Sequence, residues 1–100
     1  MYILNTTFVI PEPRLTEFTR WVREVYEKAL DDAGIFTGVT LAKVLTQVEP
    51  DTVSVAVQTR MESLEEAKKW HDTTAVLLKD DLRSRFLGQA LFFTTYMEEL

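Results

Sequence analysis

One hundred residues suit a single domain, and 46% hydrophobic with 27% charged residues is typical of a globular chain rather than a disordered one. The formal net charge of −5 argues against nucleic acid as a partner, because such binding depends mainly on the neutralisation of phosphates. The chain contains no cysteine, which excludes disulfides, thiolate metal sites and a cysteine nucleophile.

The first predicted strand covers residues 2–10 (YILNTTFVI), which are rich in β-branched and aromatic side chains and end at Pro11. This apolar run is too short to cross a bilayer, and the N-terminus lacks the basic region and the cleavage site of a signal peptide. We therefore expect a cytoplasmic protein without a membrane partner.

A helix is predicted next, within residues 11–34 (PEPRLTEFTRWVREVYEKALDDAG). Apolar residues recur in this segment at intervals of three and four, as on one face of an amphipathic helix. Pro13 suits the first helical turn, and Gly34 suits the position after the last turn. The apolar stripe consists of Leu15, Phe18, Val22, Val25, Tyr26 and Ala29.

Two strands follow, at residues 37–48 (TGVTLAKVLTQV) and 53–60 (VSVAVQTR). Both are rich in β-branched residues. The residues EPDT join them, and Pro50 suits the second position of a type I turn. We expect these strands to pair as an antiparallel hairpin.

The second helix is predicted to begin after Ser63. Ser63 and Glu66 are spaced as a capping box, in which two reciprocal hydrogen bonds satisfy N–H groups at the start of a helix. This helix runs to about Phe86. Residues 90–100 (ALFFTTYMEEL) then form the last strand, with an acidic end.

The resulting order, β-α-β-β-α-β, predicts the α+β class and a ferredoxin-like sandwich over the single domain of residues 1–100. Right-handed crossovers place both helices on one face of a four-stranded antiparallel sheet, with the first and third strands in the centre. The opposite face of the sheet is then left without a layer of its own chain.

Side chains alternate along a strand, which divides the strand residues into two faces. One assignment leaves the open face without Lys, Arg, Asp or Glu, as in a protein interface, so we expect two copies to pair through it as a homodimer. The face beneath the helices would carry Leu4, Phe8, Leu41, Leu45, Val53, Val55, Val57, Leu91 and Phe93. The open face would carry Ile3, Asn5, Thr7, Val9, Thr40, Ala42, Val44, Ser54, Ala56, Gln58, Phe92, Thr94 and Tyr96.

The two ends of the chain also carry a family likeness. The segments MYILNTTFVIPEP and RFLGQALFFTTYMEEL, with the pattern Phe93-x-Thr95-x-Met97-Glu98-Glu99, resemble a family of short bacterial proteins known as a domain of unknown function. The likeness implies the dimeric α/β-barrel superfamily, in which two ferredoxin-like sheets face one another, and it implies no reaction. The family's pattern has a histidine one turn after position 71, where this chain has Thr74, so a role tied to that histidine is not carried over.

His71, the only histidine, lies in the apolar stripe of the second predicted helix and should face the sheet between Ala67 and Ala75. Two roles stay open for it. It could serve as an acid–base group in a ligand pocket, or it could be a neutral packing residue with one hydrogen-bonded nitrogen. We favour packing, since no orienting partner is evident. Trp70 and Trp21 flank the helix stripes as anchors of the core or the interface, and Trp70 is also a candidate ligand contact.

Four further candidates are polar. Asn5, Thr7, Gln58 and Tyr96 are expected to converge on the open face. In the dimeric-barrel monooxygenases that the likeness brings in, polar and aromatic groups around such a cavity hold a phenolic substrate. The alternative is polar pairing across the dimer. The acidic pairs at 31–32, 80–81 and 98–99 diverge when helical, so we expect no metal site.

Three functions follow as hypotheses. The first is an uncharacterised, non-enzymatic homodimer that binds a small apolar or amphipathic molecule between its sheets. The second is a cofactor-free enzyme of the monooxygenase or isomerase type, with His71, Asn5 and Tyr96 as catalytic candidates. The third is a ligand-binding regulatory module. No cofactor is expected in any of them.

Overall fold

A four-stranded antiparallel sheet organises the chain, with the strand order β2-β3-β1-β4. The computed structural model describes residues 1–46 and 49–100. The predicted first and third strands are the central ones, and the last two residues of the predicted strand 37–48 lie outside the described residues. The strands are β1 (Tyr2–Pro11), β2 (Thr37–Val44), β3 (Thr52–Met61) and β4 (Leu91–Glu98).

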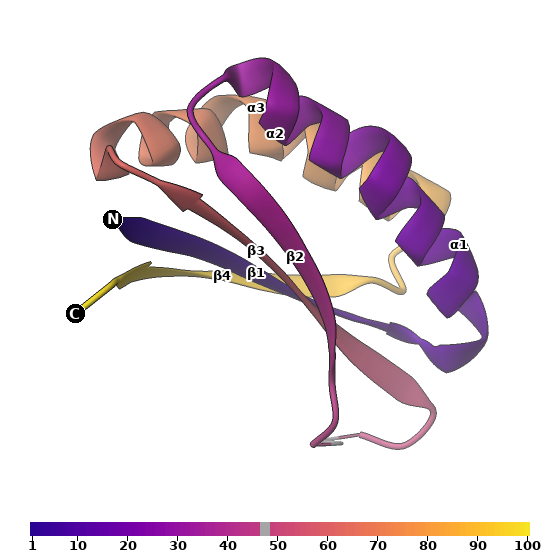
Figure 1. The fold of residues 1–100 in the computed structure, drawn as a ribbon. Helices are drawn as coiled ribbons and strands as arrows, with labels where there is room; N and C mark the ends of the chain where they lie inside the picture. The colour runs from indigo at the N-terminus through magenta and orange to yellow at the C-terminus, as the bar shows by residue number, and fades with distance from the viewer. Residues whose placement is uncertain (47–48) are drawn as a thin grey trace.

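The helices lie on one face of this sheet, as predicted (Figure 1). The first helical segment is continuous but changes its pitch, and the second is a single helix, α3 (Leu64–Arg85). The first segment consists of η1 (Glu12–Arg14), α1 (Leu15–Trp21), η2 (Val22–Tyr26) and α2 (Glu27–Ala33), of which η2 is a π-helical turn.

Local signals set the helix ends where the sequence predicts them. The Ser63 side chain accepts a hydrogen bond from the backbone N–H of Glu66 at 3.2 Å, so the cap of α3 forms. Gly34 ends α2 with a φ of 72°, a left-handed conformation that glycine adopts without steric cost. These two residues fix where the helices meet the strands.

The π-helical turn keeps one row of side chains facing the sheet. Phe18, Val22, Tyr26 and Leu30 are spaced four residues apart, and all four are buried. On a regular α-helix of 3.6 residues per turn, each four-residue step drifts by about 40°, so the row would leave the core. A wider turn in the middle of the segment reduces that drift.

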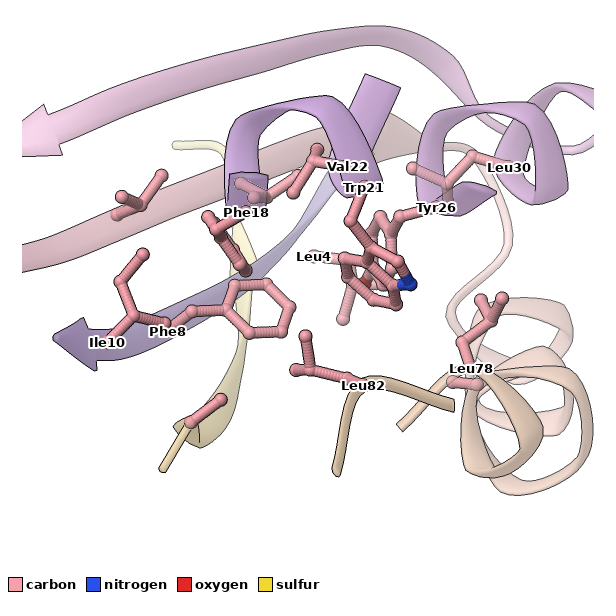
Figure 2. Close-up of a cluster of buried hydrophobic side chains, with 14 of the residues drawn as sticks. Leu4, Phe8, Ile10, Phe18, Trp21, Val22, Tyr26, Leu30, Leu78 and Leu82 are labelled. Atoms are coloured by element: carbon pink, nitrogen blue, oxygen red, sulfur yellow. The ribbon is translucent and has the colours of Figure 1, made fainter. Parts of the chain in front are cut away.

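The core lies between the helices and the covered face of the sheet (Figure 2). Phe8 of β1 is its centre, with ring contacts to Phe18 at 5.1 Å and to Tyr26 at 5.8 Å. The largest fully buried side chains are Phe8, Phe18, Phe86, Leu4, Ile10, Leu30, Met61, Leu82, Val22 and Thr6.

The predicted faces are correct for β1 and β3, where Leu4, Phe8, Val53, Val55 and Val57 are all buried. Opposite residues of antiparallel strands share a face, and β3 pairs with β2 through Leu41↔Val57 and Ala42↔Ala56, so those two β2 residues also lie as predicted.

The predicted phase of β4 is wrong. Its register with β1 is Leu4↔Tyr96, Thr6↔Thr94 and Phe8↔Phe92, so Phe92, Thr94 and Tyr96 face the helices. Leu91 and Phe93, predicted to lie beneath the helices, are instead 62% and 59% exposed on the open face. Residues 91–93 are all apolar, so the sequence offers no alternation from which the phase could be read.

Leu45 is a second correction. It was predicted to lie beneath the helices, but it follows the end of β2 and is 88% exposed. A residue beyond the last ladder pair of an edge strand has no neighbouring strand or helix to cover it.

Candidate functional site

The open face of the sheet is the first candidate surface, and it carries no charged side chain across its middle. At one end Arg60 makes an ion pair with Glu99. The corrected phase of β4 adds apolar side chains to this face rather than removing them. Its members are Ile3, Asn5, Thr7, Val9, Thr40, Ala42, Val44, Ser54, Ala56, Gln58, Leu91, Phe93, Thr95 and Met97.

A hollow of about 340 Å³ lies on this face, next to the hairpin of β2 and β3. Val9, Val44, Leu91 and Phe93 give it an apolar floor, and Thr46, Glu49 and Thr52, at the hairpin, also line it. Thr7 and Ser54 line it too, each offering a hydroxyl group. Apolar walls with a few polar groups are typical of sites for small molecules.

Asn5 is the most constrained polar group of the open face. Its Nδ2 donates a hydrogen bond to the Thr7 hydroxyl at 3.1 Å, and Gln58 is its direct neighbour on β3. Its Oδ1 is buried without a hydrogen-bond partner among the described residues. Asn5, Thr7 and Gln58 are therefore brought together on the open face, as predicted.

His71 lies on the other side of the sheet, between α3 and β4. Its Nε2 is 3.2 Å from the Thr94 hydroxyl and 2.7 Å from Nζ of Lys79. Its ring meets the ring of Tyr96 edge-on, at 6.0 Å between centroids. The side chain is 21% exposed, so it faces the sheet without being sealed from solvent.

The surroundings of His71 lower its pKa. Burial is the larger cause, because it disfavours the charged imidazole, and the ammonium group of Lys79 adds repulsion. The carboxylate of Asp72, 3.9 Å from Nδ1, acts in the opposite direction. A neutral imidazole with Nε2 hydrogen-bonded is the arrangement that the sequence favoured.

Hydroxyl groups continue inward from His71. The Thr94 hydroxyl is 3.1 Å from that of Thr6, and the Thr6 hydroxyl is 3.5 Å from that of Tyr26. Burial raises the pKa of Tyr26, which keeps its phenol protonated. Polar atoms of α3, β4, β1 and η2 thus form one chain through the core.

The sheet divides the predicted site residues into two groups. His71 and Tyr96 face the helices, whereas Asn5, Thr7 and Gln58 face away from them. The expected convergence of Tyr96 with the open-face residues is therefore wrong, for the same reason as the phase of β4.

Trp70 is an anchor of the core. Its ring lies edge-on to Phe36 at 5.0 Å and to Tyr26 at 6.1 Å. Its Nε1 is buried without an acceptor among the described residues. Trp21 is also buried, and its Nε1 donates to Asp81 at 2.8 Å.

Lys79 and Thr94 are the members of the His71 group that sequence reasoning missed. A signal for Lys79 is present, because His71, Ala75 and Lys79 are four residues apart and share one side of α3. Thr94 carried no such signal, since its side of β4 was assigned wrongly.

Within residues 1–46 and 49–100, no group of three or more His, Asp and Glu side chains is arranged to hold a metal ion. None of the described helices combines the length and apolarity required to span a membrane.

Comparison with known proteins gives a family and a fold. A family model described as a domain of unknown function, DUF4286, matches residues 1–100. No curated protein matches. This family model covers the whole chain, including the two ends whose motifs carry the likeness.

Solved structures give the fold. HapK from Hahella chejuensis has a TM-score of 0.72 at 15% identity, over 100% of this chain and 93% of its own. A dimeric ferredoxin-like protein from an uncultured marine organism has a TM-score of 0.68 at 17% sequence identity, and the match covers 98% of this chain and 94% of that protein. A monooxygenase from the gene ActVA-Orf6 of Streptomyces coelicolor, in complex with nanaomycin D, has a TM-score of 0.64 at 12% sequence identity. The match covers 99% of this chain and 88% of that protein. These likenesses confirm the ferredoxin-like fold, and at such identities they establish the fold alone.

Proposed function

This chain belongs to the family DUF4286, a domain of unknown function, and we propose that it acts as a homodimer whose open sheet faces enclose a small apolar or amphipathic molecule. The observation that carries the proposal is the uncharged middle of the open face, with a hollow whose floor is apolar. In this arrangement two sheets pack face to face, as in a dimeric α/β barrel.

The apolar side chains of the open face supply the driving force for pairing. Leu91 and Phe93 are more than half exposed, and Val44 and Met97 are each more than one-third exposed. Full burial of one such side chain contributes about 1.5–3 kcal/mol. A face that stayed in water would instead carry charged groups, which these strands place only at their ends.

Related folds support the same assembly. Two of the similar structures are described as dimeric ferredoxin-like proteins. A two-fold axis would place the same patch of each copy against the other, so the face must complement itself. Alternating small residues such as Ala42 and Ala56 with large ones such as Phe93 allow such interdigitation.

The hollow indicates what the dimer would bind. In a single chain it is open, and a second sheet face would close it. Its apolar floor favours an apolar body, and the hydroxyl groups of Thr7 and Ser54 favour one or two polar substituents on the ligand. An amphipathic molecule meets both requirements.

The assembly is tested by the sedimentation of the wild-type chain and of two arginine variants. The wild type should sediment as a dimer at micromolar concentration. Ala56→Arg, in the middle of the open face, should be monomeric with an unchanged helical signal, because it would bury an unpaired charge. Ser84→Arg, exposed on α3, is the matched control and should remain a dimer. A monomeric wild type, or a dimeric Ala56→Arg variant, would contradict the proposal.

The two other functions have less support. A cofactor-free enzyme that uses His71, Tyr96 and Asn5 around one pocket would need these side chains to converge, and the sheet lies between them. The likeness to a monooxygenase at 12% identity concerns the fold and carries no chemistry. The third function, a ligand-binding regulatory module, would use the same hollow and is supported by no residue of its own.

A further inference from the structure

Lys79 and His71 form a pair that the proposed dimer does not use. Nζ of Lys79 lies 2.7 Å from Nε2 of His71, where β4 meets α3. The pair is on the helix side of the sheet, opposite the open face, so it is independent of the proposed assembly. At this distance one proton is held between an amine and an imidazole, and the imidazole is a side chain that acts as a base near neutral pH.

The surroundings of Lys79 disfavour its charged ammonium form. Within residues 1–46 and 49–100, no carboxylate lies within 4.0 Å of its Nζ. Burial, and secondly the positive charge of Arg83, lower its pKa. The carboxylate of Asp80 lies 3.4 Å from Arg83, so it offsets the positive charge of that guanidinium and makes no ion pair with Lys79.

The other groups that face Lys79 come from β4. Its Nζ lies 4.8 Å from the ring centroid of Phe92, and Arg83 lies 5.2 Å from the same centroid. The ring favours the ammonium form, but it also removes water from one side of the amine. The Thr94 hydroxyl bonds to His71, and Tyr96 lies edge-on to the imidazole. Asp72 faces only the far side of that ring, at Nδ1.

The amine also remains reachable. Lys79 is neither buried nor fully exposed, and His71 is one-fifth exposed. A lysine that is partly desolvated and lies next to another cation is the kind that reacts as a nucleophile with carbonyl compounds. The other four lysines, Lys28, Lys43, Lys68 and Lys69, are exposed and provide internal standards.

We propose that Lys79 is a nucleophilic amine that forms a reversible imine with a small 2-oxo acid, and that His71 is the base that frees it. Arg83 lies over the same ring as Lys79 and would bind the carboxylate beside the reacting carbonyl. A 2-oxo acid fits because it carries a carbonyl group for the Lys79 amine and, on the neighbouring carbon, a carboxylate for the Arg83 guanidinium.

The reaction is balanced without an oxidant or a reductant. His71 Nε2 takes a proton from the Lys79 ammonium group, and the free amine attacks the carbonyl carbon. A C–N bond forms, the C–O bond breaks, and the two protons that remain on the amine nitrogen leave with the carbonyl oxygen as water. The imine of Lys79 with the oxo acid is the product, and water reverses the step.

The experiment traps the imine in the full-length chain. The protein is incubated with glyoxylate and sodium cyanoborohydride at pH 7, and peptide mass spectrometry measures the labelling rate of each lysine. Lys79 should react faster than each of the other four by about tenfold for every unit by which its pKa is lower. Equal labelling of the five lysines, or preference for another lysine, would overturn the proposal.

Three variants separate the roles. His71→Gln should slow the labelling of Lys79 and leave Lys69 unchanged, whereas Lys69→Arg is the matched control and should leave Lys79 unchanged. Arg83→Gln should slow the labelling of Lys79 by glyoxylate more than by acetaldehyde, which has no carboxylate, because loss of Arg83 also raises the pKa of Lys79 and so slows both reactions. Equal slowing with both reagents would overturn the assignment of an oxo acid. The wild-type comparison among five lysines holds even if a variant fails to fold.

Discussion

At the scale of single residues, His71 shows how a polar side chain is accommodated between a helix and a sheet. The small side chain of Ala75, fully buried on the next turn of α3, leaves room between His71 and Lys79. One imidazole nitrogen, Nε2, lies within hydrogen-bond distance of both the Thr94 hydroxyl and Nζ of the lysine. The neutral form is favoured while Lys79 is charged, since a proton on Nε2 would face the lysine ammonium.

The pKa of His71 is predicted to lie below that of a free histidine. Burial and Lys79 lower its pKa in the folded chain, so it should fall below the ~6.5 of an unperturbed imidazole. The unfolded chain then takes up a proton that the folded chain resists. Stability is therefore fully present above the unfolded pKa and declines as the pH falls from it towards the folded pKa. An NMR titration of the single histidine measures this directly.

A charge-removing variant provides the control for that titration. Lys79→Met removes the ammonium but keeps most of the apolar stem, so the pKa of His71 should rise towards the free value. A wild-type value at or above that of the urea-unfolded chain would show that the carboxylate of Asp72 outweighs burial and Lys79.

At the scale of elements, α3 is placed by its first turn. Ser63 caps the helix, and Glu65 and Glu66 bring negative charge to its N-terminus. Arg83 and Arg85 lie in its last turn, next to the negative end of the helix dipole. Because the cap fixes where the helix begins, it also fixes the turn on which His71 and Lys79 lie.

Loss of the cap is predicted to destabilise the domain. Ser63→Ala removes the acceptor of the Glu66 N–H and should lower the free energy of unfolding by ~0.5–2 kcal/mol. Ser84→Ala, exposed near the end of the same helix, should lower it by less, because no cap is lost and alanine favours a helix. Urea unfolding followed by circular dichroism compares the two, and an unchanged midpoint for Ser63→Ala would contradict the role of the cap.

At the scale of the whole molecule, the covered and open faces of the sheet differ in kind. Two helical segments cover one face, whose side chains are mostly buried on the central strands β1 and β3 and mostly partly buried on the edge strands β2 and β4. The open face has apolar residues on all four strands, and these side chains are partly or largely exposed. A second copy would give this 100-residue chain a second apolar layer.

Thermal unfolding should therefore depend on protein concentration. A roughly hundredfold increase in concentration stabilises a dimer by about 2.7 kcal/mol, which is worth several degrees in Tm. Differential scanning calorimetry over that range should show the rise for the wild type and not for Ala56→Arg. A Tm independent of concentration in the wild type would contradict the dimer.

The sequence by itself determined the element order, the start of α3 at Ser63, the end of α2 at Gly34 and the uncharged character of the open face. Each of these rests on local chemistry. A serine three residues before a glutamate can cap a helix in any fold, and a glycine tolerates a positive φ in any fold. The inward direction of His71 also followed from its place in the helix stripe.

Only the tertiary structure decided the phase of β4 and, with it, the partners of His71. Leu91, Phe92 and Phe93 are all apolar, so either phase buries an aromatic ring beneath the helices. Hydrogen bonding to β1 selects one register, Thr6↔Thr94, and a shift by one residue would have exchanged every side chain between the faces. Tyr96 and Thr94 therefore join His71 and Lys79 through pairing between strands, a non-local interaction that no pattern within residues 91–98 encodes.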